Sequence, residues 1–125
     1  MNKQQIIKRI KETPFNFDFT VTYGAAMVLQ DAKEDTHDID ITVSEELLNQ
    51  FIENGYKWHC SEVDPSKKIV EFGIFDICGG MNIKERVLVD GIYCESLRGI
   101  LEHKLEYTRE KDKPDIERLK AILKE

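Results

Sequence analysis

The chain of 125 residues contains 41% hydrophobic and 34% charged residues and carries a formal charge of -6. This length and composition are typical of a single globular domain over residues 1–125. The negative charge repels a phosphate backbone, which makes nucleic acid an unfavourable partner. The first dozen residues are too polar for a signal peptide, and no run approaches the roughly 20 apolar residues of a membrane span. We therefore expect a cytoplasmic protein that does not enter a membrane.

The first half of the chain predicts a helix, a strand, a second helix and a second strand. Isoleucines at helical spacing indicate a short amphipathic helix that ends before Pro14. Apolar and polar residues then alternate from Phe15 to Tyr23, which predicts a strand with one buried face that ends at Gly24. Good helix formers follow, and the alternation of residues 38–43 predicts the next strand.

The second half predicts further strands and then two helices at the C-terminus. Ser44 is placed to cap a helix with one apolar face, and residues 68–78 are rich in β-branched and aromatic side chains. An Asp-Gly pair at residues 90–91 lies between two apolar runs, which is typical of a hairpin. Ser96 should cap the next helix, and Pro114 should begin the last one. We expect an α/β (α+β) fold with a small, mixed, twisted sheet that is flanked by helices.

Two aspartates stand inside the predicted strand at "THDIDITV", residues 36–43. Residues two apart in a strand point to the same face, so Asp38 and Asp40 should project together, roughly 6 to 7 Å apart. Two carboxylates at this spacing suit a hard cation such as Mg²⁺. Solvated acids on an exposed strand face are the alternative. An EF-hand is excluded, because Val43 and Asn49 stand where its loop needs glycine and glutamate.

Asp76 is a third candidate ligand. We expect it to share a face with Val70, Phe72 and Cys78, where an unpartnered carboxylate would be costly. A metal ion shared with the aspartate pair would compensate this cost. The alternative is that Asp76 lies at the exposed end of its strand.

Gly24 marks a candidate phosphate-binding turn. A glycine followed by the small Ala25 at the start of a helix leaves backbone N–H groups free to bind a phosphate. A plain strand-to-helix turn explains the same residues.

The cysteines and histidines predict no further site. Cys60, Cys78 and Cys94 show no C-x-x-C spacing, so neither a disulfide framework nor a zinc site is indicated. His59 and His103 have no partner at ligand spacing, so a zinc or triad role is not supported. By strand alternation, the side chain of His37 should point away from the aspartate pair.

These features together resemble a known family. The stretch "YGAAMVLQDAKEDTHDIDITV" resembles the signature of the polymerase-β-like nucleotidyltransferase superfamily: a glycine turn, a helix, and T-x-D-I-D followed by an apolar residue. The stretch "LRGILEHKLEYTREKDKPDIERL" is similar to the C-terminal part of small bacterial members. These are related to antibiotic nucleotidyltransferases and to abortive-infection-type nucleotidyltransferase toxins. The resemblance extends from Tyr23 to Leu123.

The resemblance implies a role for each matched residue. Asp38 and Asp40 would be the paired metal ligands, and Asp76 would be the third carboxylate. Gly24 and Ala25 would form the triphosphate turn. Lys104 and Lys111 would be the cations that face the nucleotide. Composition alone assigns Lys104 to the solvent, because lysines are rarely buried. The chain departs from the family pattern at Ala25, where serine or glycine is usual. It also has Lys33, Glu34 and Asp35 in a segment where the family commonly has arginine.

The predicted function is that of a nucleotidyltransferase. It would move a nucleoside monophosphate from an NTP, with ATP as the first candidate, to a hydroxyl acceptor. Two Mg²⁺ ions about 4 Å apart would assist an in-line displacement, and Asp76 could accept the acceptor's proton. A homodimer or a protein partner could complete the acceptor pocket. The alternatives are a toxin-like enzyme acting on RNA or protein, and a non-catalytic binding or regulatory module, for example in a toxin-antitoxin-like pair.

Overall fold

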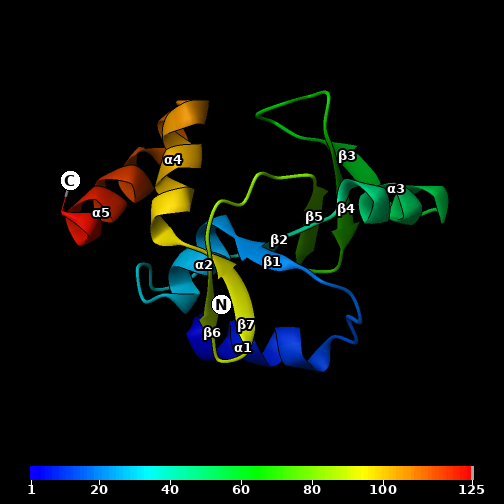
Figure 1. Cartoon of the computed structure of the whole chain (residues 1–125), viewed down its shortest axis with the longest axis horizontal. Helices are drawn as coiled ribbons and strands as arrows, with labels where there is room; N and C mark the ends of the chain where they lie inside the picture. The colour runs from blue at the N-terminus through cyan, green and yellow to red at the C-terminus, as the bar shows by residue number, and fades with distance from the viewer. Residues whose placement is uncertain (125) are drawn as a thin grey trace.

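The computed structural model describes residues 1–124, which form an α+β fold around one seven-stranded mixed sheet (Figure 1). This confirms the predicted fold class. The strands lie in the order β3-β4-β5-β2-β1-β7-β6. The helices are α1 (Lys3–Glu12), α2 (Tyr23–Leu29), α3 (Glu45–Glu53), α4 (Leu97–Tyr107) and α5 (Lys113–Leu123), with a 3₁₀ turn η1 at Glu110–Asp112. The strands are β1 (Thr20–Thr22), β2 (Ile39–Val43), β3 (Trp58–Cys60), β4 (Lys68–Phe72), β5 (Phe75–Gly79), β6 (Arg86–Val89) and β7 (Ile92–Glu95).

Local signals for helix starts and for one hairpin are confirmed. The Ser44 hydroxyl accepts a hydrogen bond from the first turn of α3, and the Ser96 hydroxyl does the same for α4. Asp90 and Gly91 have φ angles of 51° and 81° and form the turn between β6 and β7. Pro114 lies in the first turn of α5.

The first predicted strand was too long. Only Thr20–Thr22 form β1, which pairs antiparallel with β2. In this register Phe19 would lie opposite Val43, where β2 ends, so the residues before Thr20 have no partner strand. Their phenylalanine rings pack against one another and against Phe75 instead.

The predicted strand over residues 68–78 is two strands. Gly73, with a φ of 61°, begins the turn that reverses the chain between β4 and β5. Asp76 therefore does not share the face of Val70 and Phe72, as we had expected. Of the residues named in that prediction it shares a face with Cys78, while Val70 lies on the opposite side of the sheet.

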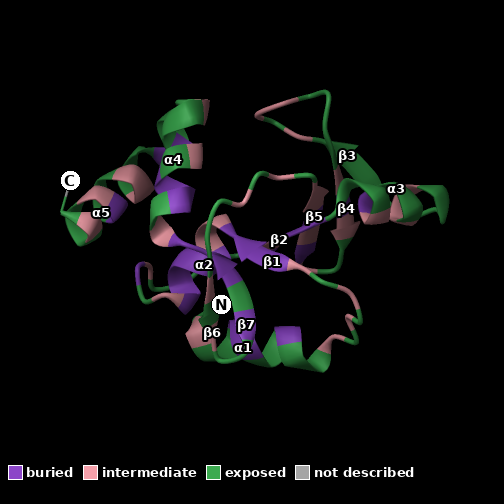
Figure 2. Ribbon diagram, in the orientation of Figure 1, coloured by how far each residue is buried: buried purple, intermediate pink, exposed green. Residues whose placement is uncertain are grey.

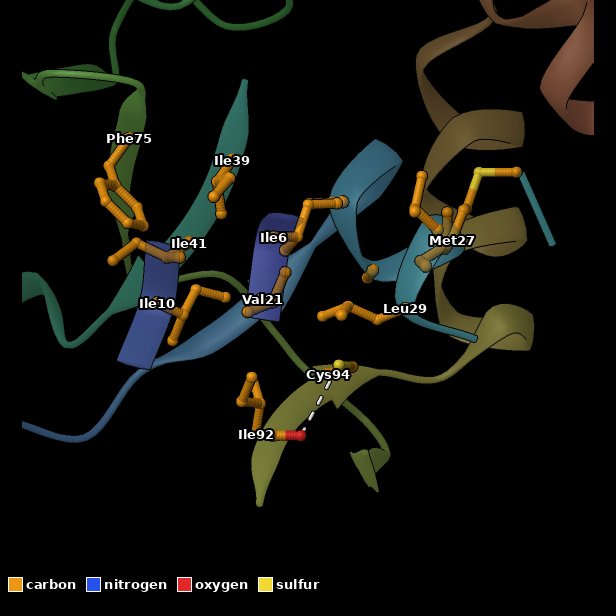
Figure 3. Packing of buried hydrophobic residues seen from close by; sticks show 14 of the residues in the cluster. Ile6, Ile10, Val21, Met27, Leu29, Ile39, Ile41, Phe75, Ile92 and Cys94 are labelled. Atoms are coloured by element: carbon orange, nitrogen blue, oxygen red, sulfur yellow. Dashed lines mark hydrogen bonds between the residues drawn. The ribbon is translucent and has the colours of Figure 1, made fainter. Parts of the chain in front are cut away.

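The two faces of the sheet differ in chemistry. Helices α1, α2 and α3 bury the apolar face, to which strand alternation directs Val21, Ile39 and Ile41 (Figures 2 and 3). The other face is polar: Thr22, Asp40, Asp76 and Glu95 lie on it. The core therefore lies on one side of the sheet and leaves the other side to chargeable groups.

Close packing of α3 on β5 supplies a test of this arrangement. A Cβ atom on Gly79 would lie 2.9 Å from the Cβ of Leu48 and 3.2 Å from the Cα of Glu45. We expect Gly79→Ala to lower the free energy of unfolding by about 1 to 3 kcal/mol, measured by urea denaturation. Leu48→Ala removes the Cδ2 atom that would lie 3.1 Å from the new Cβ, so the cost of Gly79→Ala should be smaller in that background and the two changes should not be additive. Strict additivity would show that α3 does not press on Gly79.

Candidate functional site

One edge of the sheet gathers the predicted site residues. Strands β1 and β7 end there, while β2 and β5 begin there, because β1 runs antiparallel to β2 and parallel to β7. Helices α2 and α4 leave the sheet at this edge, directly after Thr22 and after Ser96. The start of α2, the aspartates and the α4 helix are therefore brought together by topology.

The register places Asp40 and Asp76 side by side. The two residues are paired neighbours on the parallel strands β2 and β5, so their side chains lie on the same polar face. Asp38 precedes β2 and is exposed, whereas Asp40 and Asp76 are half-buried. The Asp38 carboxyl group lies close enough to Asp76 to hydrogen-bond with it. The structure thus brings together the three predicted carboxylates.

Crowding makes these carboxylates difficult to ionise. Burial, followed by repulsion from Asp38 and Asp76, raises the pKa of Asp40 from 3.8 to about 7. Burial and the nearby Asp38 also raise the pKa of Asp76. The positive charges of Lys104 and Arg109 act on Asp40 in the opposite direction, which places both cations within electrostatic reach of the carboxylates.

The predicted phosphate turn is tightly packed. Tyr23 begins α2 with a φ of 53°, a strained value for a bulky side chain, and burial raises the pKa of its hydroxyl, which hydrogen-bonds with Tyr107. A Cβ atom on Gly24 would approach the hydroxyl oxygen of Thr36 to 3.0 Å. Ala25 is fully buried, so only its backbone could contact a phosphate. Helix α2 has seven residues, and the phosphate role of Gly24 and Ala25 stays a prediction.

Lys104 is not solvated, contrary to the expectation from composition. The residue is 4% exposed, and its Nζ atom lies 3.0 Å from Oδ1 of Asp112 and 3.6 Å from Oδ2 of Asp115. The same Nζ atom lies 5.6 Å from the ring centroid of Tyr23. Buried carboxylate partners offset the cost of burying the ammonium group. Lys104 therefore lies beside Tyr23, the residue that precedes the predicted phosphate turn at Gly24 and Ala25.

Sequence reasoning missed two cations at this edge. The Nζ atom of Lys33 lies 3.3 Å from Oδ2 of Asp115 and 4.0 Å from the position of a Cβ atom on Gly24. The Nε atom of Arg109 lies 2.8 Å from Oδ2 of Asp112. The available signal for Lys33 was its position in the segment before "THDID", where the resemblance implies a cation. For Arg109 the sequence offered no such signal, because its effect on Asp40 depends on tertiary structure.

Lys111 contacts a carboxylate of a distant loop. Its side chain is 60% exposed and pairs with Glu62 of the β3–β4 loop, with 2.6 Å between Nζ and Oε2. The role of Lys111 toward a nucleotide stays a prediction.

A buried acid–base pair lies on the α4 side of the site. Glu95, at the end of β7, is 0% exposed, and its Oε2 atom lies 2.8 Å from Nδ1 of His103. Both groups lack a well-aligned hydrogen bond despite this distance. Contact with Glu95 raises the pKa of His103, which favours an ion pair over two neutral groups. The histidine thus faces a buried carboxylate that spacing in the sequence did not indicate.

A cavity of about 280 Å³ lies over this pair, lined in part by Met81, Glu95, His103 and Tyr107. A larger open hollow of about 810 Å³ lies elsewhere on the surface, near Lys3 and Arg118, and contains none of the predicted carboxylates. The smaller cavity adjoins the site, because Met81 contacts Cys78 and Tyr107 hydrogen-bonds with Tyr23. None of the three predicted aspartates lines either hollow, and Lys33 lines the larger one.

The carboxylates are the ligand type that a hard divalent cation prefers, but they do not form a complete coordination site. Oxygen donors with raised pKa values are groups whose repulsion a bound cation would relieve. Among residues 1–124, however, no three His, Cys, Asp or Glu side chains are arranged to hold an ion. The aspartates would have to converge further around Mg²⁺.

The cysteines and the length of the helices bear on two further expectations. Cys60, Cys78 and Cys94 are all free, as predicted. Over the described chain, no helix combines the length and apolar character needed to cross a membrane. Comparisons with protein-family models, with curated proteins and with solved structures found no match to this chain.

The raised pKa of Asp40 predicts a cost to stability. The folded state holds the Asp40 proton up to a pH of about 7, whereas the unfolded chain releases it near 3.8, so stability falls as the pH rises between these values. Without divalent cations at pH 8, we expect Asp40→Asn to raise the free energy of unfolding by about 2 kcal/mol. At pH 4 this gain should nearly vanish.

Urea denaturation at both pH values measures this difference. Asp90→Asn is the matched control, because it removes the same charge at a turn where asparagine tolerates the positive φ. A destabilised Asp40→Asn at pH 8 would contradict the electrostatic origin of the cost.

Proposed function

We propose that this chain is a metal-dependent nucleotidyltransferase that moves a nucleoside monophosphate from an NTP, with ATP as the first candidate, to a hydroxyl acceptor. The observation that carries the proposal is the register pairing of Asp40 with Asp76 on one polar face, with Asp38 beside them. Carboxylates that are crowded in this way are suited to a divalent cation with a bound phosphate. A cytoplasmic location, where ATP is abundant, belongs to the same proposal.

The positive groups at this edge support a phosphate-bearing substrate. Lys104 and Lys33 share the Asp115 carboxylate and lie beside Tyr23 and Gly24 respectively. Arg109, which follows the C-terminal end of α4, also acts on Asp40. In our proposal these cations bind the β- and γ-phosphates, while the aspartates face the α-phosphate.

The reaction is an in-line displacement at the α-phosphorus. The acceptor oxygen forms a bond to this phosphorus, the bond to the leaving pyrophosphate breaks, and the acceptor's proton must be removed. Asp76 is suited to accept that proton, because its raised pKa lies closer to neutral pH than that of a free aspartate. When bound, Mg²⁺ supplies polarisation of the phosphate and stabilises the developing charge on the entering and leaving oxygens.

The cavity of about 280 Å³ beside α4 is the proposed place for the acceptor. It adjoins the aspartate face through Met81 and Tyr107, and it is lined by polar groups that can orient a hydroxyl. A second copy of the chain or another protein could cover its open side.

A non-catalytic binding module is the second candidate. It is favoured by one observation, the absence of a ready-made metal cage among residues 1–124. Such a module would keep the strand pairing of the fold without using its carboxylates for transfer.

Calorimetric titration of ATP, with and without Mg²⁺, distinguishes the two functions. We expect Mg²⁺-dependent binding by the natural chain and at least tenfold weaker binding, about 1.4 kcal/mol, by the Asp38→Asn/Asp40→Asn variant. Asp90→Asn, at the opposite end of β7, should bind ATP normally. Because the amides also relieve repulsion, loss of binding would not result from unfolding. Unchanged binding in the double variant, or no binding of any NTP, would favour the module.

A further inference from the structure

The loop between β3 and β4 is tied to the C-terminal part of the chain. Oε2 of Glu62 lies 2.6 Å from Nζ of Lys111, 49 residues away in the sequence, and 3.5 Å from Nη1 of Arg109. Figure 1 shows this loop extending from the strands toward the end of α4. Glu62 therefore joins the β3 side of the sheet to the segment that follows α4.

The loop carries hydrogen bonds of its own. The backbone N–H of Ser61 donates to the carbonyl of Lys67, and the N–H of Lys67 donates to the carbonyl of Asp64. The Asp64 carboxylate accepts hydrogen bonds from the backbone and hydroxyl of Ser66, at 3.2 and 2.6 Å. These bonds fold residues 61–67 onto themselves, whereas the contact of Glu62 with Arg109 and Lys111 joins the loop to the C-terminal segment and restrains its opening.

Glu62 pairs with a cation whose charge acts on an aspartate of the site. Arg109 contacts both the buried Asp112 and Glu62, and its positive charge lowers the pKa of Asp40. Nearby cations, first of all Lys111, lower the pKa of Glu62, which keeps this carboxylate negative. An anion that enters beside Asp40 and Asp76 must compete with Glu62 for the same positive groups.

The contact is weak enough to be displaced. The side chains of Glu62 and Lys111 are 74% and 60% exposed, and ion pairs in such positions contribute little to stability because water and salt screen them. The contacts of Asp112 are different, because that carboxylate is buried. A polyphosphate carries several negative charges against the single charge of Glu62, so it competes favourably for Arg109 and Lys111.

We propose that residues 61–67 form a strap that Glu62 closes onto Arg109 and Lys111 in the free protein, and that a bound polyphosphate opens it. The inference rests on the proposed function, since the displacing anion is the triphosphate of that reaction. Glu62 of the strap competes with the nucleotide for Arg109 and Lys111. It releases these two side chains only when the substrate binds.

Amide hydrogen exchange of residues 61–67 tests the strap, with calorimetry of MgATP on the same samples. Glu62→Gln should raise exchange across the loop and bind MgATP severalfold more tightly than the natural chain. MgATP should raise exchange of the loop in the natural chain toward the level of Glu62→Gln. Glu110→Gln is the matched control, because it removes the same charge from the same segment but breaks only a local pair with Lys113.

The outcomes separate failure of the strap from failure of the proposed function. If MgATP binds but neither its binding nor Glu62→Gln changes exchange of residues 61–67, the strap is wrong and the nucleotide site remains. If Glu62→Gln alone binds MgATP, the strap is confirmed as inhibitory. If neither chain binds it, the proposed function fails and opening by a polyphosphate fails with it. Trp58, the single tryptophan, precedes the loop and gives a fluorescence readout of the same movement.

Discussion

The parallel pairing of β2 with β5 holds two carboxylates side by side, and the rest of the site depends on their repulsion. Asp40 and Asp76 cannot move apart, because the isoleucines that flank Asp40 are fixed in the core on the other face. Burial raises the pKa of both carboxyl groups, and repulsion from Asp38 raises it further unless positive charge is supplied nearby. A nearby cation would therefore stabilise the ionised carboxylates, and the strands themselves do not supply one.

The C-terminal segment supplies such cations. Helix α4 leaves the sheet at the same edge and brings Lys104 over Tyr23, while η1 positions Arg109 and Asp112. Burial alone would raise the pKa of Asp112, but hydrogen bonds from Arg109 and Lys104 outweigh it, and the pKa falls. Asp112 therefore stays charged and holds Lys104 and Arg109 by direct contact. The two cations act on Asp40 through their charge.

Features set by neighbouring residues could be predicted from the sequence, whereas features set by strand pairing could not. Ser44, Ser96 and the turn at Asp90 act on adjacent backbone, so their patterns sufficed. The alternation after Pro14 was misleading, because β2 ends too early to pair with it. The turn at Gly73 reversed the predicted face of Asp76 relative to Val70.

The candidate site divides in the same way. Asp38 and Asp40 could be singled out from the sequence, because residues two apart in a strand point to the same face. The burial of Lys104 was not foreseen, since it follows from Asp112 and Asp115 on the segment that packs against α4. The contact of Glu62 with Arg109 joins distant parts of the chain, and no local pattern encodes such a contact.

The net charge of -6 and an anionic substrate are compatible, because the field at a site depends on the nearest charges and not on the sum. Lys33, Lys104 and Arg109 lie together at one edge, and carboxylates of the C-terminal segment hold them in place. Most of these counter-charges are buried or half-buried and cannot leave. Glu62 is the exposed member of the set and belongs to a separate loop, so it is the negative charge that a polyphosphate can replace without disturbing the fold. The protein can in this way keep its cations paired while free and offer them to a substrate.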